Sequence, residues 1–344
     1  MSNPETSVTP QADPDVVAAV RELFRERSTP EAVSAAEQAG IDSGLWSQVR
    51  ELGLHLVGVP EESGGSGGTL LDAVAIVHAA GEYAAAVPVA ESIHGALLLA
   101  AAGADVPDGT ITVVPGRVAI GEEAQRVPYG RHADHVVGVT ADGEVVLSPV
   151  DVVREGVDSA GMASDTLRVG GSVVGRLDNS VDYAALLRAA AMAGAMEATA
   201  ELTRRYTSER EQFGRPVGTF QAVQQHIVTL AQMAAMSTLN AERAAIAAMR
   251  GRASFEIAAA KQVIDKNATT AARAAHQAHG AIGMTQEYRL QQLTRRLYAW
   301  RGEYGDEKSL SLAIGAAVAE HGGVHDVVTG GSEIVDVRFG TGEV

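Results

Sequence analysis

The sequence predicts a mainly α-helical protein with a small β domain between two helical parts. Helical periodicity covers residues 15–105, a short valine-rich period covers 106–180, and helical periodicity returns over 181–321. We therefore expect an N-terminal helical domain, a middle β domain and a C-terminal four-helix bundle. Residues 1–14 are polar and contain proline, which is typical of a disordered tail. Residues 322–344 form a glycine-rich tail that we expect to be loose or to pack on a partner.

In the N-terminal domain, apolar residues recur at helical spacing in five segments. The expected helices cover 14–27, 30–39, 42–52, 69–82 and 88–102. The last is almost entirely apolar, so it should be buried on most sides. Before the fourth helix, the glycines of SGGSGG resemble a phosphate-binding loop. No Lys-Ser/Thr pair follows and no clear strand–turn–helix frame surrounds them, so a flexible loop is the better interpretation.

Valine runs separated by turn residues predict the strands of the middle domain. The sequence ADGE at 141–144 lies between two such runs and is typical of a β-hairpin. In the C-terminal part, the expected helices cover 183–211, 219–250, 253–280, 286–300 and 306–321. Alanine-rich stripes, such as that of Ala189, Ala193 and Met196, indicate antiparallel helices in close contact.

Composition excludes several classes of function. The net charge of −16 argues against nucleic acid or an anionic membrane as a partner. The chain contains no cysteine, so disulfides, thiol catalysis and zinc-thiolate sites are excluded. We see no apolar run suited to spanning a bilayer, and the N-terminus lacks the features of a signal peptide. We therefore predict a soluble, cytoplasmic protein.

Three histidine groups could indicate metal ligands, and for each we favour a structural role. The first lies in a predicted loop without further ligands, the second has the spacing of helix-face contacts, and a glycine pair interrupts the third. We therefore predict no metal site. The groups are His132 with Asp134 and His135, His276 with His279, and His321 with His325 and Asp326.

The stretch YTSEREQFGRPVGTFQ, residues 206–221, joins two of the long helices. Arg210 and Phe213 are three residues apart, which predicts that they face the same way as the first helix ends. The glycine and proline that follow should end that helix, and Gln221 lies where the next one opens. A cation, an aromatic ring and an amide at one corner suit a ligand with a phosphate and a flat ring. The alternative is an ordinary helix–turn–helix corner.

With these motifs, the chain resembles the acyl-CoA dehydrogenase family over roughly residues 15–320. LWSQVRELGLHLVGVPEESGGSGG is similar to the family's stretch in which a helix leads into a glycine-rich loop. Arg210 and Phe213 correspond to its signature arginine and phenylalanine before a Gly-x-Pro turn, and Gln221 follows at the expected distance. A second signature, HQAHGAIGMTQEYRLQQLTRRLYAWRGEYG, places Gln277 and Gly280 at the family's Gln-x-x-Gly element.

The resemblance implies an FAD-dependent enzyme. In the family reaction, an acyl-CoA thioester loses an α-proton to a base and a β-hydride to the flavin. FAD lies extended at a subunit interface, where these elements of one subunit hold the ADP half of a cofactor whose flavin sits in the neighbour. The predicted cofactor-binding residues are therefore Arg210, Phe213, Gln221, Gln277 and Gly280. The planar fork of Arg210 can pair with pyrophosphate oxygens, and Gly280 lets the backbone approach closely.

The family's catalytic base has no convincing counterpart here. Many members use a glutamate before a glycine, and an ungapped count from Gln277 places Tyr304 at that position, with Glu303 one residue earlier. Other members carry the base near the start of the long helix, which corresponds to residues 183–184. Asp182 is close, but it is shifted and is not a glutamate. We therefore predict no catalytic residue in this chain.

The middle domain also departs from the family. Between residues 106 and 180 we find neither a Thr-Glu-Pro-x-x-Gly-Ser-type loop nor an aromatic-Ile-Thr-Asn-type strand, which usually bind the flavin ring, so the domain looks shortened. This resembles the smaller (β) subunit of actinobacterial heteromeric α2β2 acyl-CoA dehydrogenases, which act on bulky CoA thioesters such as sterol side-chain intermediates in lipid metabolism.

The partners implied by this resemblance are a homologous larger subunit, an acyl-CoA substrate and electron-transferring flavoprotein as the usual acceptor of the family. FAD would then be shared at the subunit interface. Two alternatives stay open. The chain could be a self-sufficient homo-oligomeric dehydrogenase with Glu303 as base, or a non-catalytic scaffold of the same fold.

Overall fold

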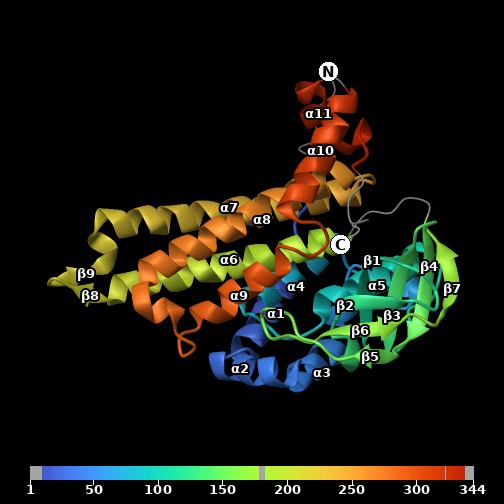
Figure 1. Cartoon of the computed structure of the whole chain (residues 1–344), viewed down its shortest axis with the longest axis horizontal. Helices are drawn as coiled ribbons and strands as arrows, with labels where there is room; N and C mark the ends of the chain where they lie inside the picture. The colour runs from blue at the N-terminus through green and yellow to red at the C-terminus, as the bar shows by residue number, and fades with distance from the viewer. Residues whose placement is uncertain (1–9, 178–182, 322, 338–344) are drawn as a thin grey trace.

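The computed structural model describes residues 10–177, 183–321 and 323–337, and the order of helical, β and helical parts is as predicted (Figure 1). In the N-terminal part, the side chains of Asp13, Thr29, Asp42 and Thr69 each cap a helix by accepting a backbone N–H. Most of the tail that we predicted to be disordered, residues 1–9, lies outside the described residues. The helices are α1 (Pro14–Arg27), α2 (Pro30–Ala39), α3 (Ser43–Glu51), α4 (Leu70–Glu82) and α5 (Val89–Ala101).

The middle part contains two small sheets, with strand orders β1-β3-β4-β7 and β2-β6-β5. Strand β1 runs parallel to β3, and the remaining pairs in these two sheets are antiparallel. The hairpin predicted at residues 141–144 is confirmed, because it joins the antiparallel strands β3 and β4. The strands are β1 (Ile111–Val118), β2 (Glu123–Pro128), β3 (His135–Thr140), β4 (Glu144–Pro149), β5 (Val152–Arg154), β6 (Ser164–Arg168) and β7 (Ser172–Arg176).

The C-terminal part is a bundle in which α6, α7 and α8 lie side by side, with the β domain near one end (Figure 1). The predicted stripe of Ala189, Ala193 and Met196 is buried in it. Within the described residues, no helix is long and apolar enough to cross a membrane. The helices are α6 (Tyr183–Glu209), α7 (Gln221–Met249), α8 (Ser254–His279), α9 (Leu290–Trp300) and α10 (Glu307–His321).

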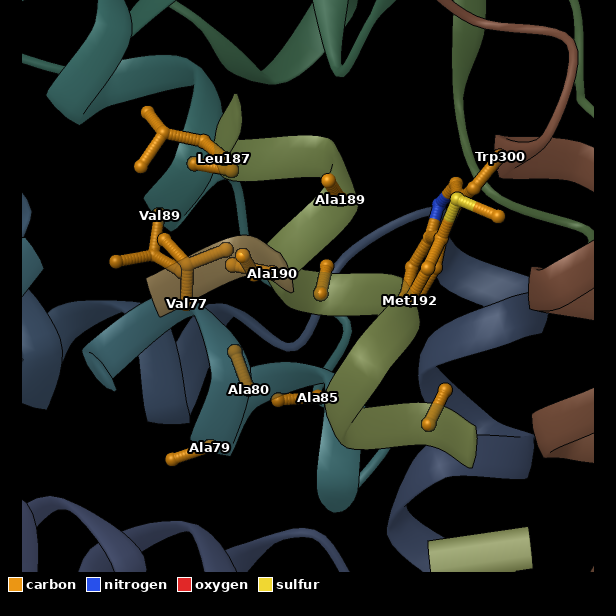
Figure 2. Close-up of a cluster of buried hydrophobic side chains, with 14 of the residues drawn as sticks. Val77, Ala79, Ala80, Ala85, Val89, Leu187, Ala189, Ala190, Met192 and Trp300 are labelled. Atoms are coloured by element: carbon orange, nitrogen blue, oxygen red, sulfur yellow. The ribbon is translucent and has the colours of Figure 1, made fainter. Parts of the chain in front are cut away.

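Helices α4 and α6 approach each other through two glycines. A Cβ atom on Gly81 would lie 1.9 Å from the carbonyl oxygen of Ala191, and one on Gly194 would lie 1.9 Å from that of His78. Figure 2 shows the small and branched side chains that pack around this part of α6, among them Ala80 and Ala190. The two backbones are therefore in contact, and glycine is required where they meet.

The C-terminal tail was expected to be loose or to pack on a partner, but residues 323–337 pack on the chain's own helices. Helix α11 (Val324–Gly330) buries Val327 in a cluster with Leu310 of α10. The Glu256 carboxylate of α8 accepts a hydrogen bond from the Ser332 backbone N–H, at 3.1 Å. Isolated buried valines give no periodic signal in so short a segment, so the sequence did not predict this packing. Residues 338–344 lie outside the described part.

Candidate cofactor pocket and central cavity

The corner after α6 is a β-hairpin. The helix ends at Glu209, and strands β8 (Glu211–Gln212) and β9 (Arg215–Pro216) pair antiparallel. Phe213 lies at the hairpin tip with φ +54°, and its side chain is 91% exposed. Our expectation that Arg210 and Phe213 share one helix face is therefore wrong, because the chain has left the helix before either residue. The expectation that α7 opens at Gln221 is confirmed.

The corner pocket is a depression of about 580 Å³ formed by this hairpin, the start of α7 and the end of α8. Four of the five predicted cofactor residues line it, and they come from two segments that are far apart in the sequence. These are Arg210, Phe213, Gln277 and Gly280. Gln221 does not belong to the lining; it is exposed on the first turn of α7, next to the lining residue Phe220.

Sequence reasoning missed the aromatic floor of the corner pocket. The Tyr206 ring stacks on the His279 ring at 4.5 Å, and the Phe220 ring meets Phe213 edge-on at 6.1 Å. Tyr206 lies one helical turn before Arg210, a spacing that could have indicated it. His279 also donates from Nδ1 to the Ala275 carbonyl at 2.9 Å, one turn back in its own helix.

The donor set of the corner pocket fits the ADP half of FAD. Arg204 and Arg188, on the same helix, are ion-paired, whereas Arg210 has no ion-pair partner within residues 10–177, 183–321 and 323–337. Gly280 adopts φ +65° and ψ −142°, a conformation for glycine, and a Cβ there would meet no atom within 4 Å. The pocket thus offers a cation for phosphate oxygens, exposed rings for a flat base and bare backbone for close approach.

Glu303, the alternative base, lies in the turn after α9 and faces Arg188 of α6. Arg188 Nε lies 2.7 Å from Glu303 Oε2, and Arg188 Nη2 donates to Glu91 Oε1 of α5 at 2.6 Å. The Nε–Oε2 contact is an ion pair rather than an aligned hydrogen bond, since neither atom has a hydrogen-bond partner in the part of the chain that the structure describes. Burial raises the pKa of Glu303, and Arg188 opposes that shift. The Glu303 carboxylate is therefore held in an ion pair within the chain.

Around this ion cluster lies the central cavity, a space of about 40 Å³ between α4, α5, α6 and the β domain. That volume holds only a few water molecules, whereas ligand pockets usually measure several hundred Å³. The lining includes Gly81, Glu91, Tyr129, Arg188, Trp300 and Glu303. The close contact of α4 with α6 leaves the cavity no room to extend between these helices.

The corner pocket and the central cavity lie at opposite ends of α6. Arg188 is 22 residues before Arg210, which directly follows the last residue of α6; this separation corresponds to about 33 Å at the rise of an α-helix. Figure 1 shows the β8–β9 hairpin at the end of α6 that points away from the β domain. A ligand held at Arg210 would have to pass along the packed bundle to reach Glu303.

Two of the remaining candidates make hydrogen bonds within the fold. Asp134 accepts a hydrogen bond from the Thr110 N–H at 2.7 Å, and His276 pairs with the Thr294 hydroxyl at 3.1 Å. Across the described ranges, no group of three His, Cys, Asp or Glu side chains could hold a metal ion. Asp182 lies outside the described residues.

Two family models match the chain. The N-terminal domain of acyl-CoA dehydrogenases matches residues 11–105, and the C-terminal domain matches residues 176–318. The acyl-CoA dehydrogenase IpdE2 of Mycobacterium tuberculosis is 31% identical over 286 residues, which cover 78% of this chain and 85% of that protein. The chain belongs to the acyl-CoA dehydrogenase family.

Solved structures share the acyl-CoA dehydrogenase fold. A chain of the ChsE4–ChsE5 complex from Mycobacterium tuberculosis superposes with a TM-score of 0.81 at 23% identity, covering 91% of this chain and 98% of that one. Butyryl-CoA dehydrogenase from Megasphaera elsdenii gives a TM-score of 0.74 at 16% identity and covers 93% of this chain and 100% of that one. Membership of the family makes the protein an oxidoreductase that acts on CH–CH bonds and uses FAD.

Proposed function

We propose that this chain is the smaller subunit of a heteromeric acyl-CoA dehydrogenase. In this role it supplies contacts to the ADP half of an FAD whose flavin ring lies in a partner subunit. The observation that carries the proposal is the contrast along α6. At one end is an open corner pocket of about 580 Å³, where Arg210 has no ion-pair partner among the described residues, and at the other is a central cavity of about 40 Å³. The corner pocket can hold the ADP half of FAD, but the described part of this chain has no catalytic cavity of sufficient size near it, so the chain supplies only half of a complete site.

Each predicted residue has a distinct role in this half-site. Arg210 would pair with the pyrophosphate through its planar guanidinium, and Phe213 would present a ring to the cofactor. The Gln277 amide would donate and accept hydrogen bonds, and Gly280 would let the backbone approach. Gln221, which lies beside the lining, would reach the cofactor from the first turn of α7. When bound, FAD supplies the hydride acceptor.

The partner is a homologous larger subunit that contributes the base and the flavin-binding loop, in an α2β2 assembly. Two similar folds come from structures with paired names, the ChsE4–ChsE5 complex and the Tcur3481–Tcur3483 steroid ACAD variant. These names support a bulky acyl-CoA substrate such as a sterol side-chain thioester. Electron-transferring flavoprotein would be the electron acceptor, as is usual in the family.

The test is Arg210→Ala in the complex co-expressed with the larger subunit. Loss of charge-assisted hydrogen bonds should weaken FAD binding by roughly 10- to 100-fold. Arg204→Ala is the matched control, because Arg204 lies on the last turns of α6, outside the corner pocket, and pairs with Glu201 at 2.6 Å. Equal FAD affinity in both variants would favour the non-catalytic scaffold instead.

The self-sufficient alternative requires Glu303 to face a substrate. Its ion pair with Arg188 and the small central cavity count against that role. No observation favours this alternative over the half-site.

A further inference from the structure

We propose that the Arg188 side chain is an internal occupant of this chain's own catalytic cavity. It fills the space where a substrate would react, and its single positive charge pairs with both Glu91 and Glu303. This inference rests on the proposed function. It explains how the part of the chain around the central cavity can lack catalytic activity and still be stably folded.

Arg188 of α6 is held by carboxylates from two other parts of the chain. It is 6% exposed on α6, it donates to Glu91 of α5, and it lies against Glu303 in the turn after α9. A buried charge is tolerated only when it is paired. Burial disfavours the charged form of Arg188, but the two carboxylates more than offset this and raise its pKa. The guanidinium of Arg188 is therefore paired with two carboxylates.

Aromatic rings complete the enclosure of the guanidinium. Its central carbon lies 5.2 Å from the Trp300 ring centroid and 5.8 Å from that of Tyr304, within the range of cation–π attraction. Tyr304 occupies the position at which the resemblance places the family's glutamate, so a ring stands where the base would be. Tyr129 is buried on the side of the β domain and lines the same cavity.

Removing the guanidinium should leave a hole of defined shape and charge. The Glu91 and Glu303 carboxylates would remain, with flat rings on one side. Such a hole suits a small planar cation. An acyl chain would still be excluded, because the glycine contact between α4 and α6 stays closed.

The experiment measures the Tm of the full chain carrying Arg188→Ala, with and without methylguanidinium at millimolar concentration. Loss of a buried pair should lower the Tm by roughly 5 °C or more. Methylguanidinium should restore about 2 °C when its concentration reaches roughly ten times its Kd. Methylammonium, which lacks the planar fork, should restore less.

Three further variants serve as controls. Arg188→Lys keeps the charge and part of the volume, so it should lose less stability and not respond to the ligand. Arg21→Ala removes an ion pair with Glu82 from a side chain that is 43% exposed, so it should also show no response. If Arg188→Ala does not fold, the yield of refolding with and without methylguanidinium gives the same answer. Arg188→Ala with Glu91→Gln and Glu303→Gln should not respond, since the two carboxylates that pair with the guanidinium are then absent.

The outcomes separate this inference from the proposed function. No specific effect of methylguanidinium on Arg188→Ala, in either Tm or refolding, would overturn the role of Arg188 and leave the half-site standing. FAD content of the assembled complex should be the same for Arg188→Ala as for the unmodified chain. A drop in FAD content at Arg188 as large as that at Arg210 would also overturn the inference.

Discussion

Two arginines on or next to α6 differ in every respect that matters for binding. Arg210 is exposed, unpaired within the described residues, and opens onto the corner pocket with Phe213. Arg188 is buried, paired with two carboxylates and enclosed by rings. A solvated cation can exchange water for a phosphate ligand at small cost, whereas a paired buried cation has no capacity left. The same residue type thus indicates a binding site at one end and a filled cavity at the other.

The largest effect should come from the glycine contact that closes the central cavity. Gly194→Ala would place a Cβ 1.9 Å from the His78 carbonyl oxygen. It should therefore lower the free energy of unfolding by about 3 kcal/mol or more. The control is Gly315→Ala on α10, where a Cβ would meet nothing within 4 Å, and which should raise stability by about 0.5 kcal/mol. Urea unfolding measures both, and similar values would mean that the helices are not in contact.

The second effect is a dependence of the free energy of unfolding on pH, caused by a histidine that lies near the central cavity. Burial lowers the pKa of His94, whose ring meets Tyr304 edge-on, to about 3. Between pH 6.5 and 3 the unfolded chain binds a proton that the folded chain does not, so stability falls as pH falls. The contribution is about 1.4 kcal/mol per pH unit. His94→Leu should reduce the fall in urea midpoint between pH 7 and 5. An unchanged slope would mean that His94 does not cause this pH dependence.

A smaller effect is expected at the tip of the hairpin. Phe213 is exposed and adopts a positive φ, so Phe213→Ala should not destabilise the free chain, and Phe213→Gly should stabilise it slightly. Both variants should weaken FAD binding to the assembled complex by roughly 3- to 10-fold, through loss of one ring contact. A loss of stability in the free chain without a change in FAD affinity would mean that the Phe213 ring contributes to packing and not to cofactor binding.

The smallest effect should come from Glu303. Glu303→Gln should leave kcat of the assembled complex within about twofold of the unmodified enzyme, since this carboxylate is paired with Arg188. Glu307→Gln, at the start of α10, is a nearby control. A selective loss of about 100-fold or more at Glu303 is the size expected for a general base, and it would support the self-sufficient alternative.

Sequence reasoning predicted the elements whose signal is local. The helices of both helical parts follow from apolar spacing, and the β3–β4 hairpin follows from its turn sequence. The β8–β9 hairpin was missed because strands of two residues carry no period. The same holds for the candidate site, since Arg210 and Gln277 lie in local family signatures and were predicted from them.

The filling of the central cavity could not be predicted from local pattern. Arg188 and Glu91 are separated by 97 residues, and the pairing depends on how α5, α6 and the turn after α9 are placed in space. In the sequence, Arg188 is a single charged residue in an alanine-rich helix, and such a residue is expected on the exposed face of the helix. The contact of Gly81 with α6 is equally hidden, since a glycine inside a helix can mark close packing or simple tolerance.

The most direct test of the half-site is the flavin content of this chain purified alone, from cells supplied with excess FAD and without the larger subunit. The flavin absorbance per protein should be far below one equivalent, and it should rise to a stoichiometric value in the complex with the larger subunit. One tightly bound FAD per isolated chain, with a complete flavin spectrum, would contradict the account.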